Sequence, residues 1–106
     1  MTRQIPEEDW KIYKIIFPKA LDRICEGVLD EIEAIRSQEG LSNHEKYLQV
    51  YKLIKKSDRN IGNIFNDYRR STALIRLGQM NTFGLLTPQE IGELSEETQA
   101  LLKFLS

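Results

Sequence analysis

The stretch FNDYRRSTALI, from Phe65 to Ile75, places two neighbouring arginines between a tyrosine and an apolar run. Arg69 and Arg70 carry guanidinium groups, which bind phosphates and carboxylates through paired hydrogen bonds. The two arginines could therefore bind one of three kinds of partner: nucleic acid, an acidic protein surface, or carboxylates of the chain itself. On a helix, Asp67 and Arg70 would lie three residues apart on one face and could form an ion pair.

The basic charge extends beyond this pair. Residues 41–80 carry a net charge of +5, whereas residues 1–40 and 81–106 each carry −3. The sequence pI of about 5.9 lies well below the value of about 9 that is typical of nucleic-acid-binding domains. Asp58 and Asp67 also interrupt the basic set. The charge pattern favours a protein-facing or intramolecular role over nucleic acid for these residues: Lys52, Lys55, Lys56, Arg59, Arg69, Arg70 and Arg76.

No catalytic or metal-binding constellation is visible in the sequence. The single histidine, His44, stands beside a predicted helix cap without the partners that a catalytic histidine needs. The single cysteine, Cys25, excludes an internal disulfide and a cysteine-rich metal site. We therefore expect no enzymatic activity, no cofactor and no metal site. The clustered carboxylates are interpreted as a solvated helix face: Glu26, Asp30, Glu31 and Glu33.

Apolar residues recur at helical spacing along the chain, which predicts an all-α fold. The first long helix is expected from near Pro6 or Pro18 to Gln38. A kink or a fresh start is expected at Pro18, because its ring would clash with the Lys14 carbonyl. The apolar stripe of this helix has alternating spacings of four and three residues, as in coiled-coil-like packing: Leu21, Cys25, Val28, Ile32 and Ile35.

A turn at EGLSNHE separates the first helix from a second, which Ser42 and Glu45 would start with a capping box. The polar run KKSDRN either breaks this second helix or exposes one of its turns. Two short helices are expected near the end of the chain, one capped by Thr87 and one starting at Ser95. Before them, a further stripe predicts a helix through the arginine pair: Ile61, Phe65, Tyr68, Thr72 and Ile75.

At 106 residues the chain is expected to form a single helical domain. Residues 1–58 would be a long dimerisation part of two antiparallel amphipathic helices, and residues 59–106 a small helical head. Two long helices cannot bury apolar surface on two sides alone, so we predict a homodimer. Since no apolar run approaches the ~20 residues of a membrane span, we expect a cytoplasmic protein without membrane insertion. The predicted dimer interface is Leu21, Cys25, Val28, Ile32, Ile35, Tyr47 and Tyr51.

Three segments occur in an order and spacing known from one family of helical regulators. FPKALDRICEGVL (Phe17 to Leu29) follows an F-x-K-A…R…G-x-L pattern, and DYRRS (Asp67 to Ser71) follows a DYRxS-type signature. GLLTPQEIGEL (Gly84 to Leu94) combines a glycine, an apolar pair and an acidic-and-leucine ending. Over residues 17–38 and 59–105 the chain thus resembles the fluorescence recovery protein family, cyanobacterial regulators of the orange carotenoid protein.

The resemblance implies an all-helical, dimeric, non-enzymatic protein that uses no cofactor. It implies binding to the photoactivated orange carotenoid protein and a faster return of that protein to its resting form, which ends quenching of the phycobilisome. Arg59 stands where the family carries a functional arginine, and Ile75 stands where it carries an aromatic residue. Together with Arg69 and Arg70, these two residues form the expected partner-binding set.

The chain departs from the family at several contact positions. Its second helix reads YLQVYKLIKK and lacks the tryptophan and aspartate that the family carries there, and Leu101 stands in place of a lysine. A divergent homologue with a different protein partner is therefore the alternative. A small helical interaction module of the antitoxin, immunity or adaptor kind fits the same pattern.

Overall fold

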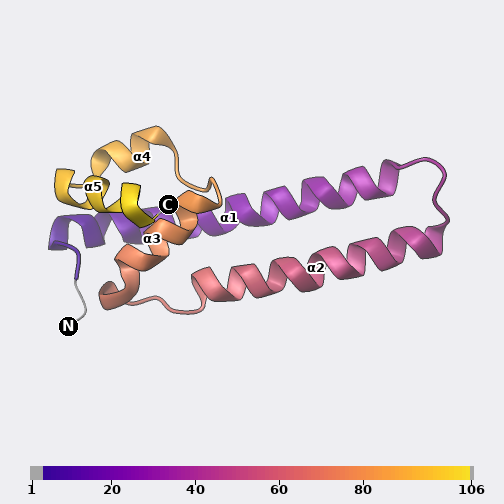
Figure 1. The fold of residues 1–106 in the computed structure, drawn as a ribbon, viewed down its shortest axis with the longest axis horizontal. Coiled ribbons are helices and arrows are strands. Elements are labelled where there is room, and N and C mark those ends of the chain that lie inside the picture. The colour runs from indigo at the N-terminus through magenta and orange to yellow at the C-terminus, as the bar shows by residue number, and fades with distance from the viewer. Residues whose placement is uncertain (1–3, 106) are drawn as a thin grey trace.

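The structure is a computed structural model and describes residues 4–105. Its elements are α1 (Glu7–Ser37), α2 (Asn43–Phe65), the short 3₁₀ helix η1 (Arg70–Thr72), α3 (Ala73–Thr82), α4 (Pro88–Glu93) and α5 (Glu96–Leu105). The described part is helical and contains no strand, which confirms the predicted all-α fold. Figure 1 shows α1 and α2 as a long antiparallel hairpin with α3, α4 and α5 gathered at one end. The molecule is elongated, with extents of 52 × 27 × 22 Å.

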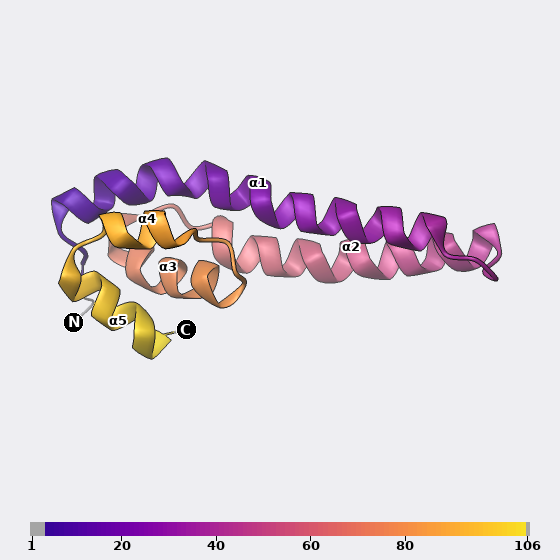
Figure 2. The ribbon, with the colours of Figure 1, turned by 90° about the horizontal axis from the view of Figure 1, so that it is seen from above.

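Helix α1 is continuous through Pro18, so of the two outcomes expected at that residue, a kink or a fresh start, the fresh start is wrong. The side chains of Pro18 and Lys14 are both exposed. Water can therefore hydrate the Lys14 carbonyl that has lost its N–H partner, which lowers the penalty of a proline inside the helix. Figure 2 shows α1 as one bowed helix above the head.

Helix α2 begins with the predicted capping box. The Glu45 backbone N–H donates to the Ser42 hydroxyl (3.1 Å), and the Ser42 backbone N–H donates to the Glu45 carboxylate (3.3 Å). The preceding turn contains Gly40 at φ +83°, a left-handed conformation that favours glycine. The run KKSDRN lies inside α2 and exposes charged side chains without breaking the helix.

The helix predicted through the arginine pair is wrong. Helix α2 ends at Phe65, and Arg69 has extended backbone (φ −141°, ψ 146°) before η1 begins. Ile64 and Phe65 are buried, which anchors the end of α2 against the head. The Asp67 carboxylate then accepts hydrogen bonds from the nearby side chains of Arg69 and Arg76. These local hydrogen bonds compete with continuation of the helix and favour a loop.

The head is built from both ends of the chain around one hydrophobic core. Its N-terminal contributors come from residues 5–20, which belong to the predicted long dimerisation part. The head therefore includes nearly the first half of α1 in addition to residues after 59. The buried apolar residues are Ile5, Tyr13, Ile16, Ala20, Ile64, Phe65, Ala73, Leu77, Met80, Leu85, Leu94 and Leu102.

Candidate functional site

Arg69 and Arg70 are neighbours in sequence but have different partners. Arg69 donates to the Asp67 carboxylate through Nε and Nη2 (3.1 Å for Nη2), and Arg76 donates to the same carboxylate at 3.0 Å. These hydrogen bonds, from Arg69 first and then from Arg76, hold the pKa of the Asp67 carboxyl well below its usual range. The Asp67–Arg70 pair that helical spacing predicted is not formed, because the segment is not helical.

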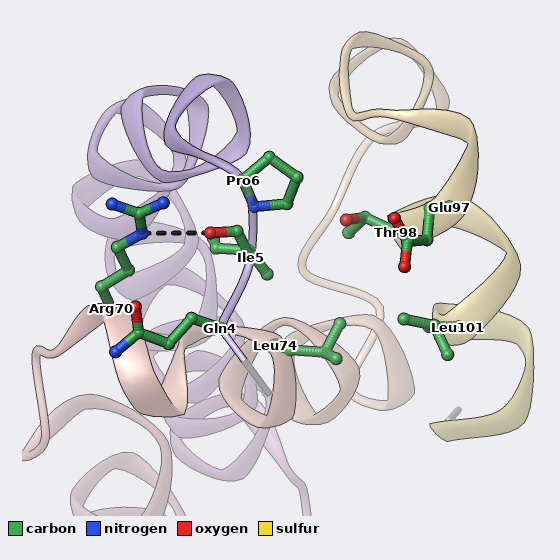
Figure 3. A pocket seen from close by; sticks show the side chains of 8 residues that line it. All are labelled: Gln4, Ile5, Pro6, Arg70, Leu74, Glu97, Thr98 and Leu101. Carbon is green, nitrogen blue, oxygen red and sulfur yellow. Dashed lines mark hydrogen bonds between the residues drawn. The ribbon is translucent and has the colours of Figure 1, made fainter. Parts of the chain in front are cut away.

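Arg70 binds the start of the chain instead. Its Nε donates to the Ile5 backbone carbonyl at 3.0 Å, and its Nη1 donates to the Glu7 carboxylate at 2.8 Å. Ile5 is only 3% exposed, so this non-helical residue is part of the head core. We refer to Gln4, Ile5 and Pro6 as the N-terminal strap. Figure 3 shows the strap between Arg70 on one side and α5 on the other.

Five aromatic residues form a cluster where α1, the end of α2 and the arginine loop meet. The Tyr68 ring lies 4.7 Å from the Phe17 ring and 5.5 Å from the Trp10 ring, measured between centroids. Tyr68 remains 48% exposed, so the cluster presents an aromatic face to solvent. The spacing of Tyr68 had placed it on a continuous helix, and no sequence signal indicated its contact with Trp10. The cluster is Trp10, Tyr13, Phe17, Phe65 and Tyr68.

A buried carboxylate joins the start of α1 to the start of α5. Asp9 is 1% exposed and accepts hydrogen bonds from the Ser95 backbone N–H (2.8 Å), the Ser95 hydroxyl (2.7 Å) and the Thr98 hydroxyl. Burial would raise the pKa of the Asp9 carboxyl, but the hydrogen bonds from Thr98 and Ser95 outweigh it and lower the pKa overall. The helix start predicted at Ser95 is present, but no local sequence signal indicates its partner Asp9, which lies near the other end of the chain.

A second ionic contact fixes α4 on α1. Arg23 donates to both carboxylate oxygens of Glu90, at 2.6 and 3.0 Å, and to the Leu85 carbonyl at 2.8 Å. Glu90 also completes a capping box with Thr87, the predicted cap of this helix. Burial would raise the pKa of the Glu90 carboxyl, whereas the hydrogen bonds from Arg23 and Thr87 lower it overall. The two carboxylates, on Asp9 and Glu90, thus hold the C-terminal helices on α1.

Comparison with known proteins identifies the architecture. No family model matches the chain, and no curated protein matches it in sequence. The solved structure of the Fluorescence Recovery Protein from Synechocystis sp PCC 6803 superposes with a TM-score of 0.75 at 21% identity, over 94% of this chain and 95% of that chain. An arginine-to-lysine mutant of the same protein matches equally well. The chain has the fold of the fluorescence recovery protein. This confirms at the level of the fold the resemblance indicated by the motifs.

Within the fluorescence recovery protein fold, the four expected partner-binding residues lie on different elements. Arg59 is exposed on α2, and Ile75 is 52% exposed on α3. Arg69 is exposed in the loop between α2 and η1 but is paired with Asp67, while Arg70 is half-buried and held by the strap. Arg59 and Ile75 are therefore available without breaking an existing contact, whereas Arg69 and Arg70 are not.

The hairpin of this fold has one side that the head leaves uncovered. Ala20 is fully buried against the head, and Leu29 lies nine residues later, about two and a half helical turns, so the two side chains point in opposite directions. Leu29 is 64% exposed. Figure 2 shows the head on one side of the hairpin only. An open groove of about 220 Å³ on the uncovered side is lined by Cys25, Val28, Leu29, Ile54, Ser57, Asp58 and Ile61.

The predicted dimer interface is divided between two environments in the protomer. Its α1 members are half-buried, in part against α2, and its α2 members are exposed. Tyr47, Tyr51 and Ile54 follow one another at spacings of four and three residues and are between 45% and 66% exposed.

No helix in residues 4–105 is long and apolar enough to cross a membrane. The same residues contain no cluster of three or more His, Cys, Asp or Glu side chains suited to a metal ion.

Proposed function

We propose that this chain is a member of the fluorescence recovery protein family: a non-enzymatic, dimeric, cytoplasmic regulator that binds the photoactivated orange carotenoid protein. Binding speeds the return of that protein to its resting form and ends quenching of the phycobilisome. The observation that carries the proposal is the fold match over nearly the whole length of both chains. The ordered sequence motifs from Phe17 to Leu94 support it independently.

The proposed mechanism is differential binding. A protein that only binds can accelerate a conformational change if it binds the transition state, or an intermediate on the path, more tightly than the starting state. Holding the separated parts of the partner close together lowers the entropy lost when they meet again. This requires a rigid surface and no cofactor, and the two carboxylate contacts at Asp9 and Glu90 supply rigidity to the head.

The proposed partner contacts are Arg59, Ile75, Arg69 and Arg70. Arg59 presents an exposed guanidinium for a carboxylate of the partner, and Ile75 adds exposed apolar surface on α3. Arg69 can contribute only by sharing or leaving Asp67. Arg59 and Ile75 are therefore expected to carry more of the binding energy than Arg69.

The proposed dimer is formed through the uncovered side of the hairpin. Leu29, Tyr47, Tyr51 and Ile54 place large apolar side chains in water there, and a contiguous exposed apolar surface is typical of protein–protein contacts. A twofold axis would bring the same surface of a second copy against them. The head remains outside this contact, so the dimer would present two heads to its partners.

The experiment mixes the protein with photoconverted orange carotenoid protein and follows the red-to-orange decay in the dark. We expect the decay to become faster with added protein and to saturate. The Arg59→Gln variant should need a higher concentration for the same acceleration, whereas Arg36→Gln, an exposed arginine near the far end of α1, should behave as the natural chain. An unchanged decay at saturating protein would exclude this function.

The alternative is an interaction module with a different protein partner. The observation that favours it is the replacement of family contact residues: YLQVYKLIKK on α2, Ile75 on α3 and Leu101 on α5. An unchanged decay, together with an intact dimer and capture of a defined partner from the source organism, would support this alternative. Retention on DNA or RNA that weakens steeply with salt would instead indicate nucleic-acid binding.

A further inference from the structure

The N-terminal strap occupies a site that has the features of a peptide-binding site. Ile5 is 3% exposed although it precedes the first helix, so it behaves as an anchor residue inserted into the head. Gln4 and Pro6 on either side of it are exposed. An extended segment held by one buried side chain is typical of bound peptides, in which few anchors carry most of the binding energy.

Arg70 binds the strap and the first residue of α1, Glu7, at the same time. Its Nε–H bonds the Ile5 carbonyl at 3.0 Å, and its Nη1–H bonds the Glu7 carboxylate at 2.8 Å. A guanidinium that binds a backbone carbonyl and a carboxylate two residues later selects an extended segment with an acid at that spacing. Arg70 belongs to the DYRRS motif and was expected to bind a partner, yet in this structure its contacts are to the chain's own start.

Space remains beside the strap. A cleft of about 210 Å³ lies between the strap and α5, and its apolar lining includes Leu74 of α3 and Leu101 of α5. Figure 3 shows these leucines below and beside Ile5, with Glu97 and Thr98 on the side opposite Arg70. The two leucines make this part of the cleft apolar. The site therefore fits one carboxylate at Arg70 and apolar or neutral side chains elsewhere.

We propose that three features form a binding site for an extended partner segment: the apolar surface on which Ile5 is buried, the Arg70 guanidinium and the adjacent cleft. The segment would carry an apolar side chain followed two residues later by a carboxylate. In the free protein the chain's own strap occupies this site. We call it the strap site. The inference deepens the proposed function, on which it rests for the role of Arg70 as a partner contact. The strap competes with the partner because it is tethered to the site and hence present at high effective concentration.

The probe is a fluorescein-labelled peptide with the sequence of residues 2–9, TRQIPEED, and binding is measured by fluorescence anisotropy. The Ile5→Ser chain, in which the strap has lost its anchor, should bind the peptide about tenfold or more tightly than the natural chain. The same peptide with serine in place of its isoleucine should bind neither chain. Should Ile5→Ser fail to fold by circular dichroism, Glu7→Gln removes only the exposed ion pair, and it should tighten peptide binding about threefold or more.

Two further variants test the arginine. Adding Arg70→Gln to Ile5→Ser should abolish peptide binding, whereas adding Arg36→Gln, an exposed arginine near the far end of α1, should leave it unchanged. Equal loss in the two double variants, or a folded Ile5→Ser chain that binds no more tightly than the natural chain, would overturn the proposal. The assay contains no carotenoid protein, so its failure is distinguishable from a failure of the proposed function.

Discussion

The Asp9 carboxylate accepts hydrogen bonds from both the backbone N–H and the hydroxyl of Ser95, at 2.8 and 2.7 Å, across a separation of 86 residues. Ser95 directly precedes α5, and its hydroxyl also accepts the Thr98 backbone N–H at 3.3 Å. The carboxylate thus binds the cap of α5 from outside the helix, where negative charge is favourable. One side chain therefore joins the start of α1 to the start of the last helix.

Replacing this carboxylate should loosen the head. Asp9→Asn keeps the side-chain volume but places an amide beside a buried N–H and two hydroxyls, so the free energy of unfolding should fall by about 2–3 kcal/mol. Urea unfolding followed by circular dichroism measures it. Glu8→Gln, at an exposed position on the same turn, is the matched control and should change stability by less than about 0.5 kcal/mol. Similar losses in both variants would contradict the role assigned to Asp9.

Acid should destabilise the protein through the two carboxylates that hold the C-terminal helices. The pKa values of Asp9 and Glu90 are lowered in the folded protein from ordinary values of 3.8 and 4.5. As pH falls, the unfolded chain therefore takes up protons at these carboxylates before the folded protein does. The two ionised carboxylates stabilise the folded protein fully above the ordinary pKa values, and this stabilisation is lost as pH drops through the pKa values of the folded protein. Urea unfolding at about pH 7 and about pH 3 should show the loss. The Asp9→Asn, Glu90→Gln double variant should lose less on acidification, and an equal loss would argue against this origin.

A charge on the uncovered side of the hairpin should separate the dimer without unfolding the protomer. Tyr51 is 56% exposed, so Tyr51→Glu leaves the protomer core intact but puts a carboxylate into the proposed interface. Sedimentation velocity at micromolar concentration should change from dimer to monomer. Gln49→Glu adds the same charge elsewhere on α2 and should remain dimeric. Val28→Glu is a less specific test, because Val28 also lies between α1 and α2. A natural chain that sediments as a monomer would exclude the dimer.

The contact between α3 and α5 should require a glycine at position 78. A Cβ atom added to Gly78 would stand 2.8 Å from the Cβ of Leu105, closer than packed carbon atoms approach. Gly78→Ala should therefore lower the melting temperature, with a loss of about 1–3 kcal/mol in unfolding free energy. Gly27→Ala meets nothing within 4 Å inside α1 and should instead stabilise by about 0.5–1 kcal/mol. Identical shifts in the two variants would be inconsistent with close packing at Gly78.

Local signals in the sequence predicted local structure well. The Ser42–Glu45 and Thr87–Glu90 capping boxes are both present, because each needs only residues three apart on the same turn. The apolar stripes located the long helices for a similar reason. Periodicity failed where it continued by chance through a loop: Phe65, Tyr68 and Thr72 keep helical spacing, yet the chain leaves the helix at Asn66 because buried Phe65 and the Asp67 ion pairs stabilise another path.

Contacts between distant residues could not be predicted in this way. In the sequence Asp9 and Glu90 are only acids near the starts of helices, and nothing near them along the chain indicates that they bind Ser95 and Arg23. The strap illustrates the same limit, since Ile5 stands outside any apolar stripe. Which of two adjacent arginines is free to bind another molecule depends on such contacts, so the motif could suggest a partner-binding segment without assigning roles within it.

Because the head is assembled from both ends of the chain, it cannot be completed early during synthesis. The α1–α2 hairpin can form from neighbouring segments as soon as they leave the ribosome, whereas Asp9 must wait for Ser95 and Thr98. During that interval the buried face of residues 5–20 lacks the cover that α4 and α5 provide, and exposed apolar surface of this kind promotes aggregation. Formation of the head is therefore a late, long-range folding event. We expect the Asp9 contact to form after the transition state of head folding and not before it.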